Sequence, residues 1–359
     1  MPFAVMASGI FSYRYRCVMR RKMVFWGAVA VGLAFLFILN VLSGAVDVPL
    51  GQTLGVLTGS DAGVDESVRF IILHLRLPQT ITALLCGSAL AVCGLMLQTV
   101  FHNPLADSSL LGISSGAGLG VALVMLFLGG GIMLGALSIE GYVAVLVAAF
   151  AGAFAMAFVM YMLSTVIRSS SALLVAGIIF GYVASSAIAL LNFFSSDDGI
   201  RAFMAWGLGS FGNVSVSRLP IFCSVVVVGL VASVFMVKPL NVLVLGEQYA
   251  ESLGVRTVAL RNRVLVVTGL LTAATTAFCG PVSFIGLAVP HIARMVLRSD
   301  DYRVLLPSTM AVGAVVALLC NYFCTSPWGG IVIPVNVVTP LVGAPVVVYV
   351  MMKGQRRMR

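Results

Sequence analysis

Residues 75–120 of the chain read LRLPQTITALLCGSALAVCGLMLQTVFHNPLADSSLLGISSGAGLG. Within this stretch, residues 79–100 carry no charged side chain. A run of about 20 apolar residues is long enough to cross a bilayer as a helix. Glycine and alanine recur along the run, and small residues let membrane helices approach closely. Asn103 and Pro104 then end the run, so we expect a transmembrane helix followed by a turn.

The composition of the whole chain agrees with this stretch. Over 359 residues, the chain is 60% hydrophobic and 9% charged, with a mean hydropathy of +1.11. A soluble domain with this balance would precipitate. We therefore predict an all-α fold, a polytopic transmembrane helical bundle in a single domain over residues 24–352. Its expected ten spans are 24–43, 79–100, 108–128, 141–166, 172–195, 219–237, 264–280, 283–297, 304–324 and 335–352.

Lysine and arginine predict the orientation of the chain, because they accumulate in short cytoplasmic loops. If both termini are cytoplasmic, most of the 21 basic residues are cytoplasmic as well. The exceptions are Arg69, Arg76, Arg201 and Arg218. We expect cytoplasmic basic segments at residues 1–23 and 353–359. The apolar run after the first segment is too long for a signal peptide and lacks a clear cleavage site, so we expect it to be retained. The net charge of +9 then reflects the orientation of the chain in the membrane. We therefore expect membrane lipid, but no nucleic acid, as a partner.

Two short segments are expected to shape the bundle without doing chemistry. In the first, Asn103 and Pro104 end a helix, and the next helix can be capped by Asp107, Ser108 or Ser109. We expect this segment to be a cytoplasmic turn. The second, residues 283–297, is a partial or broken span, in which Pro290 interrupts the helix and His291 can bond the carbonyls that are freed.

Several kinds of chemistry are absent from the sequence. There is no GxxxxGK[ST] motif to hold ATP phosphates. The three histidines stand in different segments, and the seven cysteines form no CxxC pair, so we predict neither catalytic residues nor a metal site. All twelve carboxylates fall in loops or at loop margins, which disfavours a carrier driven by an ion gradient but keeps it as the alternative. We therefore expect something outside this chain to supply the energy.

Residues 245–255, LGEQYAESLGV, are unusually polar for this chain. Leu245, Tyr249 and Leu253 recur every four residues, which predicts a short helix with one apolar stripe. Gly254 suits its C-terminal end. Glu247 and Glu251 repel slightly unless a basic group faces them. A simple amphipathic loop helix is the alternative to a binding element.

Three stretches together resemble one known family. They are residues 75–120, residues 240–263 (LNVLVLGEQYAESLGVRTVALRNR) and residues 280–307 (GPVSFIGLAVPHIARMVLRSDDYRVLLP). In this order they are similar to the FecCD family, the permease subunits of ABC importers for iron chelates, haem and cobalamin. The resemblance covers nearly the whole chain after residue 24.

The resemblance implies a type II ABC importer permease fold in a bacterial inner membrane. It implies a non-enzymatic transport subunit that pairs with a second copy of itself, with two ATP-binding cassette subunits inside and a periplasmic substrate-binding protein outside. ATP and magnesium would bind the ATPase subunits, so no cofactor is expected in this chain. An iron–siderophore complex is the expected substrate, followed by haem or cobalamin.

The resemblance also implies roles for particular residues. It assigns coupling to the ATPase to Leu245, Gly246, Glu247, Tyr249, Ala250, Glu251, Leu253 and Gly254. Ser170 and Ser171 match an inner gate, although a serine cap on the helix explains them equally well. Arg76 matches an external arginine that docks the binding protein. The chain departs from the family pattern at Gln79, Thr325, Val332 and Asn336, so docking by salt bridges is expected to be weaker or rearranged.

Overall fold

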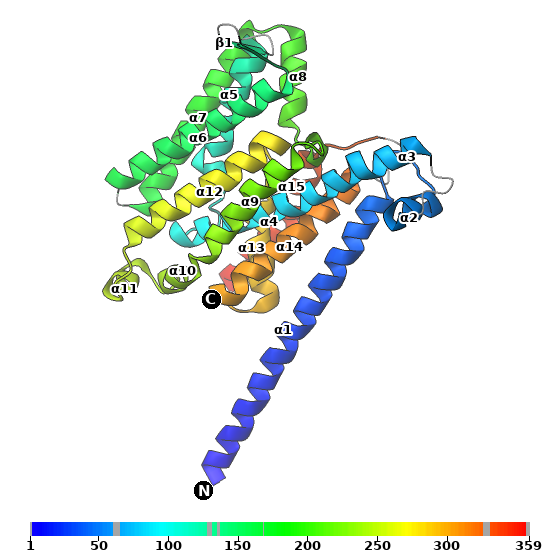
Figure 1. Ribbon diagram of the computed structural model, residues 1–359. Coiled ribbons are helices and arrows are strands. Elements are labelled where there is room, and N and C mark those ends of the chain that lie inside the picture. The colour runs from blue at the N-terminus through cyan, green and yellow to red at the C-terminus, as the bar shows by residue number, and fades with distance from the viewer. Residues whose placement is uncertain are drawn as a thin grey trace.

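The computed structural model describes residues 2–59, 65–127, 131–134, 137–167, 169–325 and 331–356. Figure 1 shows a bundle of helices with α1 extending beyond it at its N-terminal end. The elements are α1 (Pro2–Leu42), α2 (Leu50–Thr58), α3 (Glu66–Phe70), η1 (Ile71–Arg76), α4 (Leu77–Val100), η2 (Ser108–Leu111), α5 (Ile113–Ala122), η3 (Leu123–Phe127), β1 (Gly131–Leu134), β2 (Leu137–Glu140), α6 (Tyr142–Val166), α7 (Ser170–Phe194), α8 (Asp197–Gly207), η4 (Phe211–Asn213), α9 (Leu219–Val234), α10 (Val237–Leu243), α11 (Glu247–Ser252), α12 (Thr257–Cys279), α13 (Ile285–Leu297), α14 (Tyr302–Thr325) and α15 (Val335–Arg356). The strands β1 and β2 form one antiparallel hairpin.

The predicted transmembrane segments are helical in the structure. In the described part of the chain, six helices are long and apolar enough to cross a membrane, or seven if α9 and α10, which meet at 53°, form one bent span. Three shorter apolar helices, at residues 113–127, 285–297 and 335–349, coincide with the remaining predicted spans. The chain begins and ends on the same side of the bundle (Figure 1), as an even number of crossings requires. The all-α transmembrane fold is therefore confirmed.

The centre of the bundle is built on α4. In the most apolar 18-residue window of the span that contains α4, 83% of the residues are buried. The corresponding window of α12 follows with 78%. Small residues bring α4 close to its neighbours: a Cβ atom at Gly87 would collide with the carbonyl oxygen of Gly313 in α14. A Cβ atom at Gly94 would likewise collide with that of Gly286 in α13. The predicted packing through small residues is thus present where the backbones are closest.

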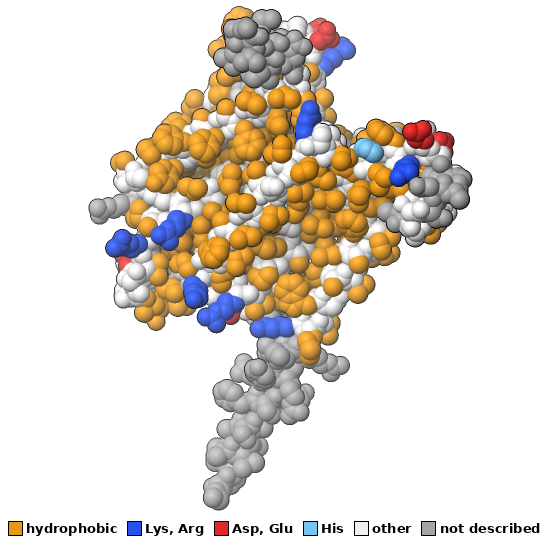
Figure 2. Space-filling model, in the orientation of Figure 1, with side chains coloured by type: hydrophobic (Ala, Val, Ile, Leu, Met, Phe, Trp, Pro, Cys, Tyr) orange, Lys and Arg blue, Asp and Glu red, His pale blue; other side chains and the backbone are white. Residues whose placement is uncertain are grey.

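The surface divides into an apolar belt and polar ends. Figure 2 shows hydrophobic side chains across the middle of the face and most of its lysines and arginines along one edge. This edge is the end of the bundle where α10 and α11 lie in Figure 1. The belt includes α7, in which only 17% of the most apolar window is buried. Such a face must be covered by lipid or by another protein.

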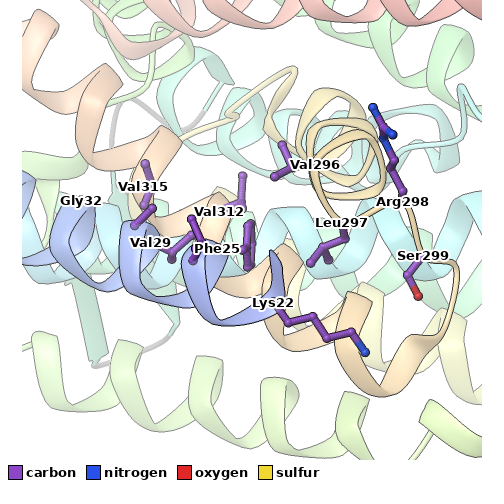
Figure 3. A pocket seen from close by; sticks show the side chains of 12 residues that line it. Lys22, Phe25, Val29, Gly32, Val296, Leu297, Arg298, Ser299, Val312 and Val315 are labelled. Carbon is purple, nitrogen blue, oxygen red and sulfur yellow. The ribbon is translucent and has the colours of Figure 1, made fainter. Parts of the chain in front are cut away.

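An open groove lies between α1, the C-terminal end of α13 and the middle of α14 (Figure 3). It is lined mostly by apolar side chains, and Lys22 lies at one of its ends. α1 packs against α14 beside this groove.

Candidate functional site

The segment between α10 and α12 forms a short helix held between two glycines. Gly246 precedes α11 with a φ of 115° and Gly254 follows it with a φ of 84°. The backbone nitrogen of Gly254 donates to the Glu251 carbonyl (2.9 Å), and that of Val255 donates to the Ala250 carbonyl (3.0 Å). These two bonds form a Schellman motif, in which glycine is favoured because its φ is positive. The predicted C-terminal role of Gly254 is therefore confirmed.

The apolar side chains predicted for this segment are exposed. Leu245 is 65% exposed, Tyr249 52% and Leu253 57%, whereas Ala250 is fully buried. Leu245 lies before Gly246 and so precedes α11 rather than forming part of a three-turn helix, because α11 has only six residues. We call the exposed surface of Leu245, Tyr249 and Leu253 the α11 patch. Ala250 fixes the patch to the bundle from the other side.

The two glutamates of the segment have different surroundings. Glu251 accepts a hydrogen bond from the Thr257 hydroxyl (2.7 Å), which ties the end of α11 to the start of α12. Glu247 is half-buried, and its charge acts on the guanidinium of Arg261. The repulsion that the sequence predicts between the glutamates is therefore offset by these contacts.

Arg261 joins this segment to the neighbouring helices. Its side chain is 3% exposed. Nε donates to the Ser164 hydroxyl (3.0 Å), and Nη2 donates to the carbonyls of Ser164 (2.9 Å) and Ile167 (2.8 Å). Carbonyls at a helix C-terminus lack intrahelical partners and attract positive charge, and these two lie at the end of α6. The start of α12 is thereby anchored to the turn between α6 and α7.

The predicted gate serines lie at the beginning of α7, directly after this turn. Ser169 caps α7, because its side chain accepts from the Ala172 backbone nitrogen (3.3 Å). The capping role thus belongs to Ser169, while Ser170 is half-buried and Ser171 is exposed. A role for Ser170 and Ser171 in a gate stays a prediction.

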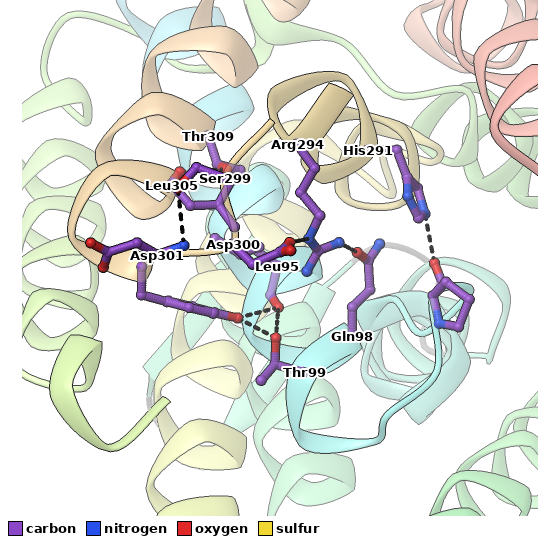
Figure 4. Close-up of polar contacts among 12 residues, drawn as sticks. Leu95, Gln98, Thr99, His291, Arg294, Ser299, Asp300, Asp301, Leu305 and Thr309 are labelled. Atoms are coloured by element: carbon purple, nitrogen blue, oxygen red, sulfur yellow. Dashed lines mark hydrogen bonds and ion pairs between the residues drawn. The ribbon is translucent and has the colours of Figure 1, made fainter. Parts of the chain in front are cut away.

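A polar network joins α4, α13 and the start of α14 near the same end of the bundle (Figure 4). Arg294 Nη1 donates to Gln98 Oε1 (2.8 Å), and Arg294 Nε forms an ion pair with Asp300 (3.7 Å). Gln98 donates in turn to the Leu287 carbonyl (3.3 Å). Tyr302 bonds the Thr99 hydroxyl and the Leu95 carbonyl. These residues hold three helices together.

The four predicted helix-break residues meet in this region. Nε2 of His291 lies 2.8 Å from the Pro104 carbonyl oxygen, and Asn103 Oδ1 accepts from the Leu105 backbone nitrogen (2.9 Å). The prediction that Pro290 breaks the helix is wrong, because α13 continues through it from Ile285 to Leu297. Pro290 removes the donor for the Gly286 carbonyl, which faces Gly94 of α4 instead.

The turn after Pro104 is less solvated than the sequence indicates. Asp107 is 7% exposed and lies against Gly286 of α13, and its Oδ2 accepts from the Ser109 hydroxyl (3.2 Å). The chain therefore enters the bundle at Asp107, whereas Pro104 and Leu105 before it are exposed, and the expectation that this turn is cytoplasmic stays a prediction. The expected cap is wrong, since Asp107 precedes the 3-10 turn η2 and α5 begins after Gly112.

Arg76 is not available for docking. Its side chain is 6% exposed, and its guanidinium donates to the carbonyls of Val41 (3.1 Å), Leu42 (2.6 Å) and Val46 (2.5 Å). Val41 and Leu42 are the last residues of α1 and Val46 follows it, and carbonyls at a helix C-terminus need partners. We correct the docking prediction accordingly: Arg76 fixes the turn after α1 to α4.

Two of the positions that depart from the family pattern have structural contacts. Gln79 donates to Asn321 (2.9 Å), which donates to Asn40 (2.8 Å), so that α4, α14 and α1 are linked. Asn336 donates to the carbonyls of Gly207 (3.1 Å) and Pro281 (2.6 Å). Thr325 is buried and Val332 is exposed. These contacts give no salt-bridge partner to an external protein.

Sequence reasoning missed the anchoring role of Arg261, although a signal for it is present. Arg261 lies three and four residues before Val264 and Leu265, on the apolar face of α12. A charged residue on such a face must be paired or reach out of the bundle.

Among the described residues, no group of three His, Cys, Asp or Glu side chains lies close enough together to hold a metal ion.

Comparison with known proteins agrees with this architecture. The model of the FecCD transport family matches residues 32–353. The vitamin B12 import system permease proteins BtuC of Salmonella schwarzengrund (strain CVM19633) and Salmonella typhimurium (strain LT2) are each 34% identical over 283 residues, which cover 79% of this chain and 84% of the relative. A solved inward-facing structure of a metal-chelate type ABC transporter superimposes with a TM-score of 0.76 at 25% identity, over 92% of this chain and 99% of that one. The chain belongs to the FecCD transport family and is a multi-pass permease of an ABC importer.

Proposed function

We propose that two copies of this chain form the membrane path of an ATP-driven importer for a bulky metal chelate. Two ATP-binding cassette subunits bind at the cytoplasmic end, where both termini lie, and a periplasmic binding protein delivers the substrate from outside. The chain itself carries no ATPase motif. Transport proceeds by alternating access, in which nucleotide and loaded binding protein favour different packings of the dimer.

The observation that carries this proposal is the α11 patch. Three large apolar side chains lie more than half exposed around a six-residue helix, at the end of the bundle richest in arginine and lysine. A helix this short is marginal in water and gains stability mainly from packing. A partner that covers the patch removes its apolar surface from water. The ATPase subunit is the partner that the family provides.

The contacts around α11 give a route from this patch to the path. Glu251 links α11 to Thr257 at the start of α12, and Arg261 links α12 to the turn that precedes Ser170 and Ser171. A displacement of α11 by the ATPase is thereby transmitted to the first turn of α7. Ser170 and Ser171 are our candidates for the residues that open and close the inner gate.

The second copy is proposed to cover the faces that this chain leaves open. α7 exposes Val175, Ile179, Tyr182 and Val183 along its middle. α15 adds an open apolar groove lined by Pro340, Leu341, Ala344, Pro345, Val348, Tyr349 and Met352. Together these faces offer far more apolar area than a monomer generally exposes to water.

An iron–siderophore complex is our first candidate for the substrate. Cobalamin is the second, and it is favoured by a specific observation: the relatives that are 34% identical are vitamin B12 permeases. Both are bulky chelates, for which a wide path lined by small and apolar side chains is suitable. The ion-gradient carrier is not favoured by the family.

Reconstitution into liposomes tests the proposal and separates the substrates. The chain is purified with its cognate ATPase subunit and binding protein, and the uptake of a ferric siderophore and of cyanocobalamin is measured with internal or external ATP. We expect ATP-dependent uptake of one of them, and no uptake by the chain alone under a proton or sodium gradient. Gradient-driven uptake without the ATPase would overturn the proposal.

A further inference from the structure

The helix α7 is held by the bundle on one side only. Of its 25 residues, only Leu173, Gly177 and Ala184 are buried, and their spacing places them on one face of the helix. This face packs against α5 and the turns η2 and η3, and a Cβ atom at Gly177 would meet the Leu110 carbonyl oxygen in η2. The opposite side of α7 is left exposed by the described part of the chain.

The exposed side of α7 has two edges of different character. One edge carries Tyr182, with Ser185 and Ser186 beside it on the helix surface, and all three are exposed. The other edge carries the exposed residues Val183 and Leu190. Tyr182 is 70% exposed and Val183 is 60% exposed, but consecutive residues of a helix point about 100° apart. The two side chains are thus similarly exposed but face different directions.

Tyr182 lies at the middle of a membrane span. The helix α7 is long and apolar enough to cross a membrane, and twelve residues separate Tyr182 from each of its ends, Ser170 and Phe194. Twelve helical residues rise about 18 Å, and half of the hydrocarbon core of a bilayer is about 15 Å thick. A crossing helix with both ends at the membrane surfaces therefore places Tyr182 near the bilayer centre. From there its side chain is too short to reach either surface.

The hydroxyl groups of this edge need partners that lipid tails cannot provide. Within the described residues, the hydroxyls of Tyr182 and Ser186 have no hydrogen-bond partner, whereas that of Ser185 donates to the Gly181 carbonyl (2.9 Å). A polar group without a partner is costly in hydrocarbon. Water in a cavity, or a polar group of another chain, satisfies such a hydroxyl. The edge that carries Val183 has no such requirement.

The Tyr182 edge also leads to the proposed inner gate. Ser171, one of the two gate candidates, is exposed and lies eleven residues before Tyr182. Eleven residues make about three helical turns, so the two side chains lie on one line along α7. Exposed polar side chains therefore occur on the same edge at the middle of the span and at its first turn.

We propose that this edge of α7 lines a water-filled path between two copies of the chain, and that Tyr182 contacts the chelate as it passes. Such a path rests on the proposed function, in which two copies surround the substrate. Water in the path satisfies the hydroxyls of Tyr182 and Ser186. Two-fold symmetry places one Tyr182 on each wall. Its ring offers a flat apolar surface, and its hydroxyl can donate to or accept from the polar groups of a bulky chelate.

Modification by a charged thiol reagent tests which way this edge faces. Tyr182→Cys and Ser185→Cys report on the proposed path, and Val183→Cys and Leu190→Cys are the matched controls on the other edge. Each full chain is reconstituted in liposomes with its ATPase subunit. Methanethiosulfonate ethyltrimethylammonium is applied to both sides of the membrane, with and without ATP. The wild-type chain, with its seven native cysteines, gives the background rate.

The expected difference in rate follows from the chemistry of the reagent. It attacks the thiolate, and a thiol in apolar surroundings stays protonated. We expect Tyr182→Cys and Ser185→Cys to react at least about tenfold faster than the two controls, because one pKa unit changes the thiolate fraction about tenfold. Equal rates for all four variants would overturn the proposal, since the two edges would then share one environment.

Uptake by the same variants tests whether Tyr182 meets the substrate. The uptake of a ferric siderophore or of cyanocobalamin, whichever the wild type transports, is measured before and after modification. We expect Tyr182→Cys to transport before modification and to lose most of its uptake afterwards, because the attached cation stands in the path. Val183→Cys should keep its uptake under both conditions. Unaltered uptake by fully modified Tyr182→Cys would overturn the proposed contact.

Failure of the proposed path and failure of the proposed function give different results. If the path lies elsewhere, the wild type still shows ATP-driven uptake while the four cysteine variants react alike. If the chain is not an ATP-driven importer, the wild type shows no such uptake, and the reaction rates of the four variants can still be compared.

Discussion

At the scale of single residues, two glycines fix the ends of α11 and a buried arginine fixes the end of α1. Gly246 and Gly254 reverse the chain on each side of α11, with φ values of 115° and 84°. Other L-residues are strained in these conformations. Arg76 satisfies three backbone carbonyls at the end of α1 and just beyond it, where a Cβ on Gly44 would collide with its side chain. The two glycines and Arg76 therefore act by fixing the geometry of the backbone.

Gly254→Val should distort the end of α11 and weaken association with the ATPase. The left-handed conformation costs an L-residue about 1–2 kcal/mol, and a β-branched residue is strained further. Gly254→Asn is the matched control, because asparagine tolerates a positive φ, and it should associate almost normally. Co-purification of the ATPase subunit measures the effect. Normal association of the valine variant would show that the geometry of this turn is not needed.

Arg76→Glu should destabilise the chain rather than alter only the encounter with the binding protein. The new carboxylate would lie among carbonyl oxygens, and an unpaired buried charge costs about 3–5 kcal/mol. We expect a lower melting temperature and less protein in the membrane. Arg201→Glu, at an exposed position on α8, is the control and should keep both. A normally stable Arg76→Glu variant with weakened receptor binding would instead restore the docking role.

At the scale of elements, the contact between α12 and α6 connects the α11 patch to the rest of the bundle. Arg261 donates to two carbonyls at the end of α6, and the next residue, Asn262, accepts from the Ser164 hydroxyl (2.5 Å). α10 is tied to the start of α14 as well, because Asn241 Oδ1 accepts from the Tyr302 backbone nitrogen (2.7 Å). The segment around α11 is therefore held at both of its ends.

Arg261→Ala should partly uncouple ATP hydrolysis from transport. The variant leaves the Ser164 and Ile167 carbonyls without this donor, at about 1–3 kcal/mol for each unsatisfied buried group. We expect a lower melting temperature, retained ATPase association and a reduced number of substrate molecules moved per ATP hydrolysed. Arg263→Ala, an exposed neighbour on the same helix, should leave this ratio unchanged. If the two variants behave alike, the anchor plays no part in coupling.

Hydropathy alone predicted the helices, because a bilayer demands a long apolar run wherever the chain crosses it. The spacing of apolar residues indicated the apolar stripe around α11, and the preference for glycine at a helix C-terminus indicated Gly254. Such local patterns failed where partners come from distant segments. The burial of Arg76 depends on carbonyls about 30 residues earlier, and that of Asp107 on Gly286 in another helix. Pro290 stays within α13 because a neighbouring helix, not the local sequence, accommodates the freed carbonyl.

At the scale of the whole molecule, the bundle has a buried centre and exposed outer faces. α4, α12 and α14 are largely buried and packed through glycine, whereas α1, α6 and α7 are mostly exposed. Among these faces, α7 is the one that the second copy is proposed to cover. The helix α11 projects from one end of this arrangement (Figure 1), and the account of the chain as an ATP-driven permease depends on what covers the α11 patch.

Co-purification of the ATPase subunit with Leu253→Asp tests this central claim most directly. The substitution places a carboxylate in the α11 patch, and burial of that charge against a partner costs about 3–5 kcal/mol. The side chain is 57% exposed in the free chain, so folding and membrane insertion should be normal. Val216→Asp, an exposed apolar position on the loop before α9, is the control. We expect Leu253→Asp to reach the membrane at wild-type levels, to lose the ATPase subunit and to lose transport, while the control keeps all three. Full ATPase association and full transport by Leu253→Asp would contradict the account.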